Sequence, residues 1–125
     1  KVQDSLNEVS KAVKGSKILV LGITYKPDID DLRESPALDV VGLLRNKGAE
    51  VSYHDPYVAK VKHDGWELTS VSDLLESVAE VDCVVITTNH KSYDYAAILQ
   101  KAKLIVDTRN ALGKLGRNNP KVVRL

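Results

Sequence analysis

The sequence is poor in sulfur: among 125 residues it has one cysteine, Cys83, and no methionine. A single cysteine cannot form a disulfide within the chain, which favours a reducing compartment and a cytoplasmic location. Because a complete natural protein begins with methionine, a chain that begins at Lys1 is expected to be a fragment of a longer protein.

Long hydrophobic runs and an excess of charge of one sign are also missing. No apolar run approaches the roughly 18 residues of a membrane span, and the polar N-terminus does not resemble a signal peptide. The 18 basic and 17 acidic residues are well mixed and give a net charge of +1. We therefore expect no membrane span and neither a nucleic-acid nor a membrane partner. Length and composition fit one ordinary domain.

Short apolar runs alternate with segments of helical periodicity along the chain. Strands are predicted at 17–21, 50–54, 82–87 and 103–107, with shorter candidates at 66–69 and 122–123. Helices are predicted at 2–14, between Pro36 and Gly48, around 74–78 and at 92–101. This alternation predicts an α/β, Rossmann-like three-layer domain, with a mostly parallel sheet and helices on both faces.

Several residues have the types expected at helix ends. Ser35 and Pro36 fit an N-cap and a first helical position, and Gly48 fits the residue that follows a helix C-terminus. Ser70 and Asp73 resemble a capping box ahead of the next helix.

Ligands of doubly wound sheets bind beyond the carboxyl ends of the strands. The candidate segments are therefore 22–35, 54–58, 87–91 and 107–111. A dinucleotide fold has Gly-x-Gly-x-x-Gly after its first strand, whereas this chain has only Gly22 and then about a dozen residues before the next helix. Loops of that length in compact domains are usually functional or mobile, although a solvated charged loop fits this composition equally well.

Segment 21–37 resembles the signature that opens the C-terminal domain of the UDP-glucose/GDP-mannose dehydrogenase family. The family pattern is Gly, two residues, Tyr-Lys, a spacer, Asp, one residue, Arg, then a small residue and Pro, and each element is present at matching spacing. The resemblance continues through 51–56, 82–87 and 106–109. The segments 33–36 and 54–56, together with His90, make the branch that acts on UDP-N-acetylhexosamines look closer than the UDP-glucose branch.

The resemblance implies one part of an NAD-dependent nucleotide-sugar 6-dehydrogenase, which oxidises the C6 hydroxyl of a UDP-sugar to a carboxylate in two hydride transfers. Residues 1–15 would be the end of the central connecting helix, and 16–125 the UDP-sugar-binding domain. The implied partners are the UDP-sugar and an N-terminal domain that binds most of the NAD, in an enzyme that is a homodimer or larger. The family's catalytic cysteine lies outside this chain, so the domain alone is expected to be inactive.

Four residues match family positions that have roles in binding. Tyr25 and Lys26 match residues that line the UDP moiety, and a lysine supplies a positive charge for a diphosphate. Arg109 matches an arginine that reaches the nucleotide or sugar of the substrate, and Arg33 matches one that approaches NAD on the other domain. Structural alternatives are an exposed Lys26, an Arg33 paired with neighbouring carboxylates, and an Arg109 that is a rim charge beside Asp107.

The remaining polar residues are expected to have structural roles. Asp31 is expected to organise its loop, and Asp55 to initiate a turn because a proline follows it. Cys83, inside an apolar run, is expected to be a small buried residue and not a nucleophile. The three histidines have no metal-ligand spacing, so no metal site is expected, and His90 is interpreted as a polar loop residue.

A different class of function also fits the predicted fold: a stand-alone flavodoxin-like nucleotide-binding or signalling module. A phosphoacceptor receiver has an aspartate at a strand end, as Asp107 is here, but the acidic pair expected after the first strand is missing. The sequence does not specify which sugar would be bound.

Overall fold

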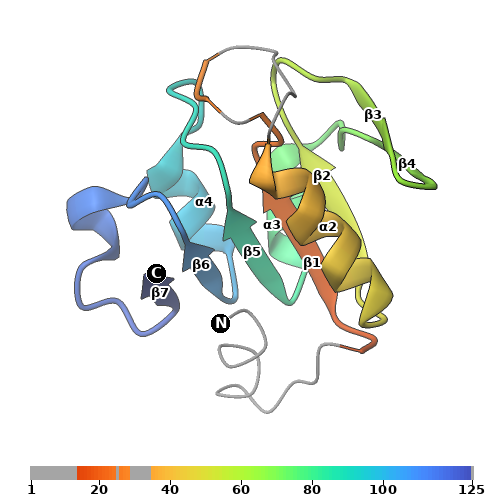
Figure 1. Ribbon diagram of the computed structural model, residues 1–125. Coiled ribbons are helices and arrows are strands. Elements are labelled where there is room, and N and C mark those ends of the chain that lie inside the picture. The colour runs from red at the N-terminus through yellow and green to blue at the C-terminus, as the bar shows by residue number, and fades with distance from the viewer. Residues whose placement is uncertain (1–13, 25, 29–34, 125) are drawn as a thin grey trace.

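The central element is a five-stranded parallel sheet in a computed structural model that describes residues 14–24, 26–28 and 35–124. In spatial order its strands are β2 (Glu50–His54), β1 (Lys17–Leu21), β5 (Cys83–Ile86), β6 (Ile105–Asp107) and β7 (Val122–Arg124). The chain goes from β1 to β2 on one side and then crosses β1 to place β5, β6 and β7 on the other side. The switch point of the doubly wound fold therefore lies between β1 and β5. The predicted fold class is confirmed, as are all five of these strands (Figure 1).

Helices cover both faces of the sheet because successive strand residues point to opposite sides. In β1, Leu19 and Leu21 face a cluster with α3 (Leu74–Glu80) and α4 (Tyr95–Lys101). The alternate residue Val20 packs with α2 (Pro36–Asn46) on the other face. Figure 1 shows α2 in front of the sheet and the other two helices behind it. Apolar residues on both faces thus bury the central strands β1, β5 and β6, whereas the edge strands β2 and β7 are partly exposed.

The strand predicted at 66–69 does form, but it does not extend the main sheet. It is β4 (Trp66–Thr69), which pairs antiparallel with β3 (Lys60–His63) in a separate two-stranded sheet, and β3 was not predicted. The turn between them is Asp64-Gly65, with φ of 42° and 85°. Asp-Gly with two positive φ angles is a typical hairpin turn, because its twist matches that of the strands.

The start and the end of α2 agree with the sequence signals, except for one hydrogen bond. Pro36 is the first helical residue, Ser35 is the N-cap residue, and Gly48 follows the helix with a φ of 90°. The hydroxyl of Ser35 does not cap the helix, however. It donates to the carbonyl oxygen of Ile23 at 2.6 Å and so ties the helix start to the segment after β1.

The capping box predicted at Ser70 and Asp73 is wrong. The N-cap residue of α3 is Asp73, whose Oδ1 accepts a hydrogen bond from the backbone N–H of Glu76 at 3.1 Å. Ser70 instead bonds Asp55, its hydroxyl accepting from the Asp55 N–H at 3.1 Å. The same aspartate-capping arrangement at Asp94 makes α4 begin at Tyr95, three residues later than predicted.

A lysine holds the C-terminal end of α4. After the short 3-10 helix η1 (Gly113–Gly116), the chain returns to β7, and the Lys121 ammonium group lies against the helix end. It donates to three carbonyl oxygens, those of Leu99, Gln100 and Ala102, at 2.6, 3.3 and 3.0 Å. A cation at this position satisfies helix carbonyls that have no partner within the helix.

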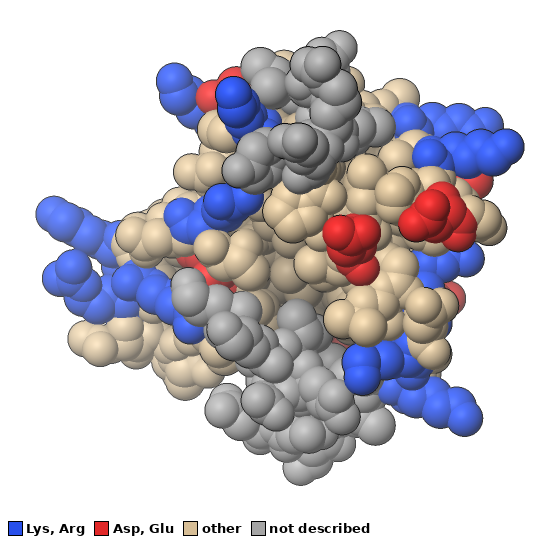
Figure 2. Space-filling model, in the orientation of Figure 1, with Lys and Arg blue, Asp and Glu red and all other residues tan. Residues whose placement is uncertain are grey.

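On the face seen in Figure 2, Lys and Arg side chains lie in separate groups around the outline. Within the described part of the chain, no helix is long and apolar enough to cross a membrane. The helix expected at 2–14 lies almost entirely outside the described residues, as does Asp31.

Candidate functional site at the carboxyl edge of the sheet

The register of the sheet brings the carboxyl ends of β1, β2, β5 and β6 level with one another along the strands, and Figure 1 shows the arrowheads of β5 and β6 directed to the same side. Leu21 of β1 lies level with His54 of β2 and Ile86 of β5. Ile86 in turn lies level with Asp107 of β6. The segments that follow these strands therefore meet at one edge, where the switch point between β1 and β5 provides space for a ligand.

Two threonines after β5 hold the segment after β1. The hydroxyl of Thr87 donates to the carbonyl oxygen of Gly22, and that of Thr88 donates to the carbonyl oxygen of Thr24. Gly22 has a φ of 84°, and a Cβ built on it would lie 2.4 Å from Cβ of Thr88. Glycine is therefore required here both for its backbone conformation and for the close approach of Thr88.

Asp55 is buried directly after β2, with 3% of its surface exposed. Its Oδ1 accepts from the backbone N–H of Tyr57 at 2.8 Å, so the predicted role in initiating a turn is confirmed. Its Oδ2 does more than the sequence indicated, because it accepts from the backbone N–H of Ile23 at 2.8 Å and lies 2.9 Å from Nε2 of His90. One carboxylate thus connects the segments that follow β1, β2 and β5.

His90 lies in the loop that follows β5, as expected, but it is not a surface residue. The side chain is fully buried, with Tyr57 packed against its ring at a centroid distance of 5.0 Å. Nδ1 accepts from the backbone N–H of Asp28 at 2.7 Å, and Nε2 faces Asp55. Sequence reasoning placed His90 in a segment that follows a strand, but nothing local indicated that the ring would be buried.

His54 and Tyr93 form a second contact between strand ends. The Tyr93 hydroxyl donates to the carbonyl oxygen of His54 at 2.8 Å and lies 3.0 Å from its Nδ1. Burial lowers the pKa of His54 below its usual value of 6.5, and burial raises the pKa of Tyr93. Both side chains are therefore neutral at pH 7, as expected for groups that pack between loops.

Arg109 lines a cleft where β5 and β6 end and α2 begins. The cleft has a volume of about 270 Å³, and its lining comprises Pro36, Ala37, Val40, Thr87, Thr108 and Arg109. Nε of Arg109 donates to the carbonyl oxygen of Thr87 at 3.1 Å, which orients the guanidinium group at the cleft wall. A guanidinium group beside a helix N-terminus is suited to bind a phosphate or another anion.

Asp107 does not act as a free carboxylate next to Arg109. It is fully buried, and its two oxygens accept from the backbone N–H groups of Arg109, Ala111 and Leu112 at 3.0–3.1 Å. These bonds shape the turn after β6 and occupy the oxygens that a phosphoacceptor would need. The signalling alternative is therefore disfavoured at this residue.

The structure brings only part of the predicted site together. Lys26 is exposed after β1, and its carbonyl oxygen accepts from the hydroxyl of Thr24 at 2.7 Å. Lys26 does not belong to the described residues that line the cleft beside Arg109. Tyr25 and Arg33 lie outside the described residues, so their predicted roles stay predictions.

A family model agrees with the motif that covers this edge. The model for the UDP-glucose/GDP-mannose dehydrogenase family, UDP binding domain, matches residues 19–114, about three quarters of the chain. The chain belongs to this family. The matched range contains every strand end described above, from β1 to the turn that follows β6.

Individual relatives include both sugar branches of the family. The chain is 39% identical to a UDP-glucose 6-dehydrogenase of Rhizobium meliloti, over 82% of this chain and 25% of that protein. It is 34% identical to a UDP-N-acetyl-D-mannosamine dehydrogenase of Methanococcus vannielii, over 80% and 24%. A solved UDP-D-ManNAc dehydrogenase of Pyrococcus horikoshii superimposes with a TM-score of 0.73 at 30% identity, covering 90% of this chain and 26% of that one. The chain thus spans about a quarter of the length of these relatives.

Cys83 has the properties of a core residue in this UDP binding domain, as predicted. Its side chain is fully buried in β5, and burial raises the pKa of the thiol to about 12. A thiol with such a pKa is protonated at neutral pH and is a poor nucleophile. Within the described residues, no group of three His, Cys, Asp or Glu side chains could hold a metal ion.

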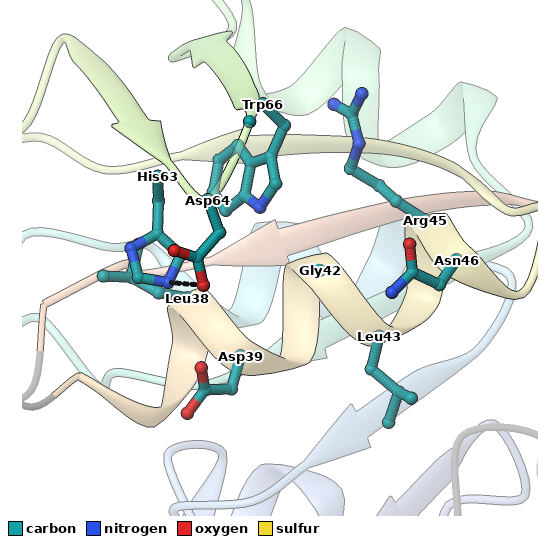
Figure 3. A pocket seen from close by; sticks show the side chains of 10 residues that line it. Leu38, Asp39, Gly42, Leu43, Arg45, Asn46, His63, Asp64 and Trp66 are labelled. Atoms are coloured by element: carbon teal, nitrogen blue, oxygen red, sulfur yellow. Dashed lines mark ion pairs between the residues drawn. The ribbon is translucent and has the colours of Figure 1, made fainter.

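A second hollow of the UDP binding domain lies away from the carboxyl edge, between α2 and the β3–β4 turn (Figure 3). Its volume is about 430 Å³. Arg45 lies over the ring of Trp66 at 5.9 Å, and Nε2 of His63 lies 3.3 Å from Oδ2 of Asp64. The charged and aromatic side chains that line the hollow thus already contact each other in pairs. We assign the hollow no part in the candidate site.

Proposed function

We propose that the carboxyl edge of this domain binds the UDP moiety of a UDP-sugar, in an NAD-dependent 6-dehydrogenase of which the chain forms one part. The observation that supports the proposal is the cleft beside Arg109, at the switch point of a domain of the UDP-binding family. Ligand pockets commonly have volumes of about 300–1,000 Å³. A cleft of about 270 Å³ therefore suits part of a nucleotide sugar, and the rest would contact another domain.

Lys26 and Arg109 would act on the diphosphate from two different strand ends. Both are exposed cations that follow strands of the main sheet, and between them lies the end of β5. Together they would offset the two negative charges of the diphosphate, with Tyr25 lining the nucleotide. In the same proposal residues 1–15 form the end of a connecting helix, and 16–125 the UDP-sugar-binding domain.

The first turn of this domain has only Gly22 and lacks the glycine fingerprint with which a dinucleotide fold holds a pyrophosphate. Thr88 packs closely against Gly22, with its Cβ 2.4 Å from the position that a Cβ on Gly22 would take. We therefore assign NAD mainly to an N-terminal domain outside this chain, with Arg33 reaching toward it. Because Cys83, the one cysteine of the sequence, is buried in β5, we propose that the chain on its own would not reduce NAD.

Titration of UDP into the ¹⁵N-labelled chain tests the proposal. We expect amide shifts in 22–27 and 107–111, and at least tenfold weaker binding in Arg109→Ala, because a charged hydrogen bond contributes about 1.5–3 kcal/mol. Arg117→Ala, which removes another exposed arginine, is the control. Unmoved amides in both segments at millimolar UDP would contradict the proposal.

A test of the proposed role of Arg33 requires the complete enzyme, because the NAD would be bound mainly by another domain. Arg33→Ala should weaken NAD binding or turnover there, while leaving the UDP affinity of this domain unchanged. Unaltered NAD kinetics would exclude the proposed bridge between substrate and cofactor.

A further inference from the structure

His90 contacts the segment that carries Lys26 on both sides of the lysine. Its Nδ1 accepts from the backbone N–H of Asp28 at 2.7 Å, and its Nε2 lies 3.4 Å from the hydroxyl of Thr24. Lys26 is the residue midway between those two contacts. The backbone just after the exposed lysine is therefore hydrogen-bonded to the buried ring. On the other side, the hydroxyl of Thr24 lies near the same ring and donates to the carbonyl oxygen of Lys26 at 2.7 Å.

The hydrogen bonds define the tautomer of His90. A backbone N–H can only donate, so Nδ1 must be unprotonated and Nε2 must carry the proton. Nε2 then donates to Oδ2 of Asp55 at 2.9 Å, and Asp55 in turn accepts from the N–H of Ile23. The neutral ring thus links the connection after β1 to a carboxylate fixed at the end of β2.

A reciprocal bond closes the contact between the two loops. Oδ1 of Asp28 accepts from the backbone N–H of Lys91 at 2.8 Å, next to the bond that His90 accepts from Asp28 itself. Asp28 has a φ of 64°, a conformation that a residue other than glycine adopts only where its surroundings stabilise it. The two bonds to the loop after β5 provide that stabilisation.

We propose that His90 is a positioning residue for UDP binding, which fixes the backbone around Lys26 so that the ammonium group is held where the diphosphate binds. The inference rests on the proposed function. His90 cannot touch the ligand itself, because it is fully buried. It acts by removing the cost of ordering the Lys26 segment when UDP binds.

Two substitutions of His90 separate its two bonds. In His90→Asn the amide oxygen can take the position of Nδ1 and accept from Asp28, whereas in His90→Gln the amide nitrogen can take the position of Nε2 and donate to Asp55. The test measures the UDP affinity of the chain by calorimetry, with Lys26→Met as the reference. We expect Lys26→Met and His90→Gln each to weaken binding about tenfold, and His90→Asn to stay within about threefold of the wild type.

The double variant distinguishes positioning from a loss of general stability. If His90 acts through Lys26, adding Lys26→Met to His90→Gln weakens binding by less than about threefold further. A full tenfold additional loss overturns the inference, as does wild-type affinity in His90→Gln. A wild type that does not bind UDP, or a Lys26→Met variant that binds normally, overturns the proposed function and this inference together.

A milder pair of variants keeps the inference testable if His90→Gln does not fold. Asp28→Gly keeps the positive φ and the N–H but removes the acceptor for Lys91. Asp64→Gly is the matched control, because Asp64 also has a positive φ and lies in the β3–β4 turn. We expect Asp28→Gly to weaken UDP binding at least threefold and Asp64→Gly to leave it unchanged; equal affinities overturn the inference.

Discussion

Replacing Gly22 by alanine should destabilise the domain through two separable effects. One is conformational, because the φ of 84° at this residue is unfavourable for any residue with a Cβ. The other is steric, because the new Cβ would lie 2.4, 2.7 and 2.9 Å from Cβ, the carbonyl oxygen and Cα of Thr88. Two of these three atoms belong to the backbone, so a change of side-chain rotamer cannot relieve the contact.

The size of each effect can be worked out from the structure with an internal comparison. Gly65 has a φ of 85°, and a Cβ built on it has no atom within 4 Å. Gly65→Ala therefore carries only the conformational cost of about 1–2 kcal/mol. Overpacking adds about 1–3 kcal/mol, so Gly22→Ala should cost roughly 2–5 kcal/mol. A domain has a total stability of about 5–15 kcal/mol, so this single methyl group would remove a large share of it.

Urea unfolding of the wild type and both variants, followed by far-UV circular dichroism, measures these costs. With a slope of about 2 kcal/mol per molar urea, a difference of 2 kcal/mol between the two variants separates their midpoints by about 1 M. Equal midpoints for Gly22→Ala and Gly65→Ala would refute the reasoning, because they would show that the segment after β1 moves away from Thr88 without cost.

Two further predictions concern single side chains. Lys121→Met should lower the free energy of unfolding by about 1–2 kcal/mol, because the carbonyl oxygens at the end of α4 lose their ammonium donor; Lys103→Met, which alters an exposed lysine, is the control, and equal melting temperatures would contradict the expectation. For His54, whose pKa burial lowers below 6.5 in the folded state, the unfolded chain takes up the proton at higher pH. The contribution of neutral His54 to the free energy of unfolding should therefore be fully present above pH 6.5 and be lost as the pH drops through the lowered pKa. His54→Gln should reduce this pH dependence. An unchanged dependence of the free energy of unfolding on pH, measured by urea unfolding at several pH values, would contradict the expectation.

Local sequence patterns were sufficient to predict most of the fold. The central strands β1, β5 and β6 are short and mostly apolar runs, whereas the edge strand β2 alternates polar and apolar residues, and both patterns are visible without the structure. The β3–β4 hairpin was missed, although its turn has the sequence Asp64-Gly65, a strong local hairpin signal. The error at Ser70 had a different cause, since its hydroxyl bonds Asp55, which is 15 residues away in the chain.

The candidate site could be predicted only in part. The family motif named Lys26 and Arg109, and the structure shows Arg109 at a cleft wall, oriented by the carbonyl oxygen of Thr87. No motif pointed to His90 as a central residue. Its partners Asp55 and Asp28 are 35 and 62 residues away along the chain, so only the packing of the strand ends brings them together.

The sequence by itself determined the α/β fold class, the order of the elements and the family, because these depend on periodicity and on motifs within short segments. Only the tertiary structure decided which polar residues at the carboxyl edge are exposed and which are buried. That outcome depends on the register of β1, β2, β5 and β6, which sets the strand ends at one level. At that level Thr88 fills the space beside Gly22, and the ring of His90 reaches both the backbone of Asp28 and the carboxylate of Asp55.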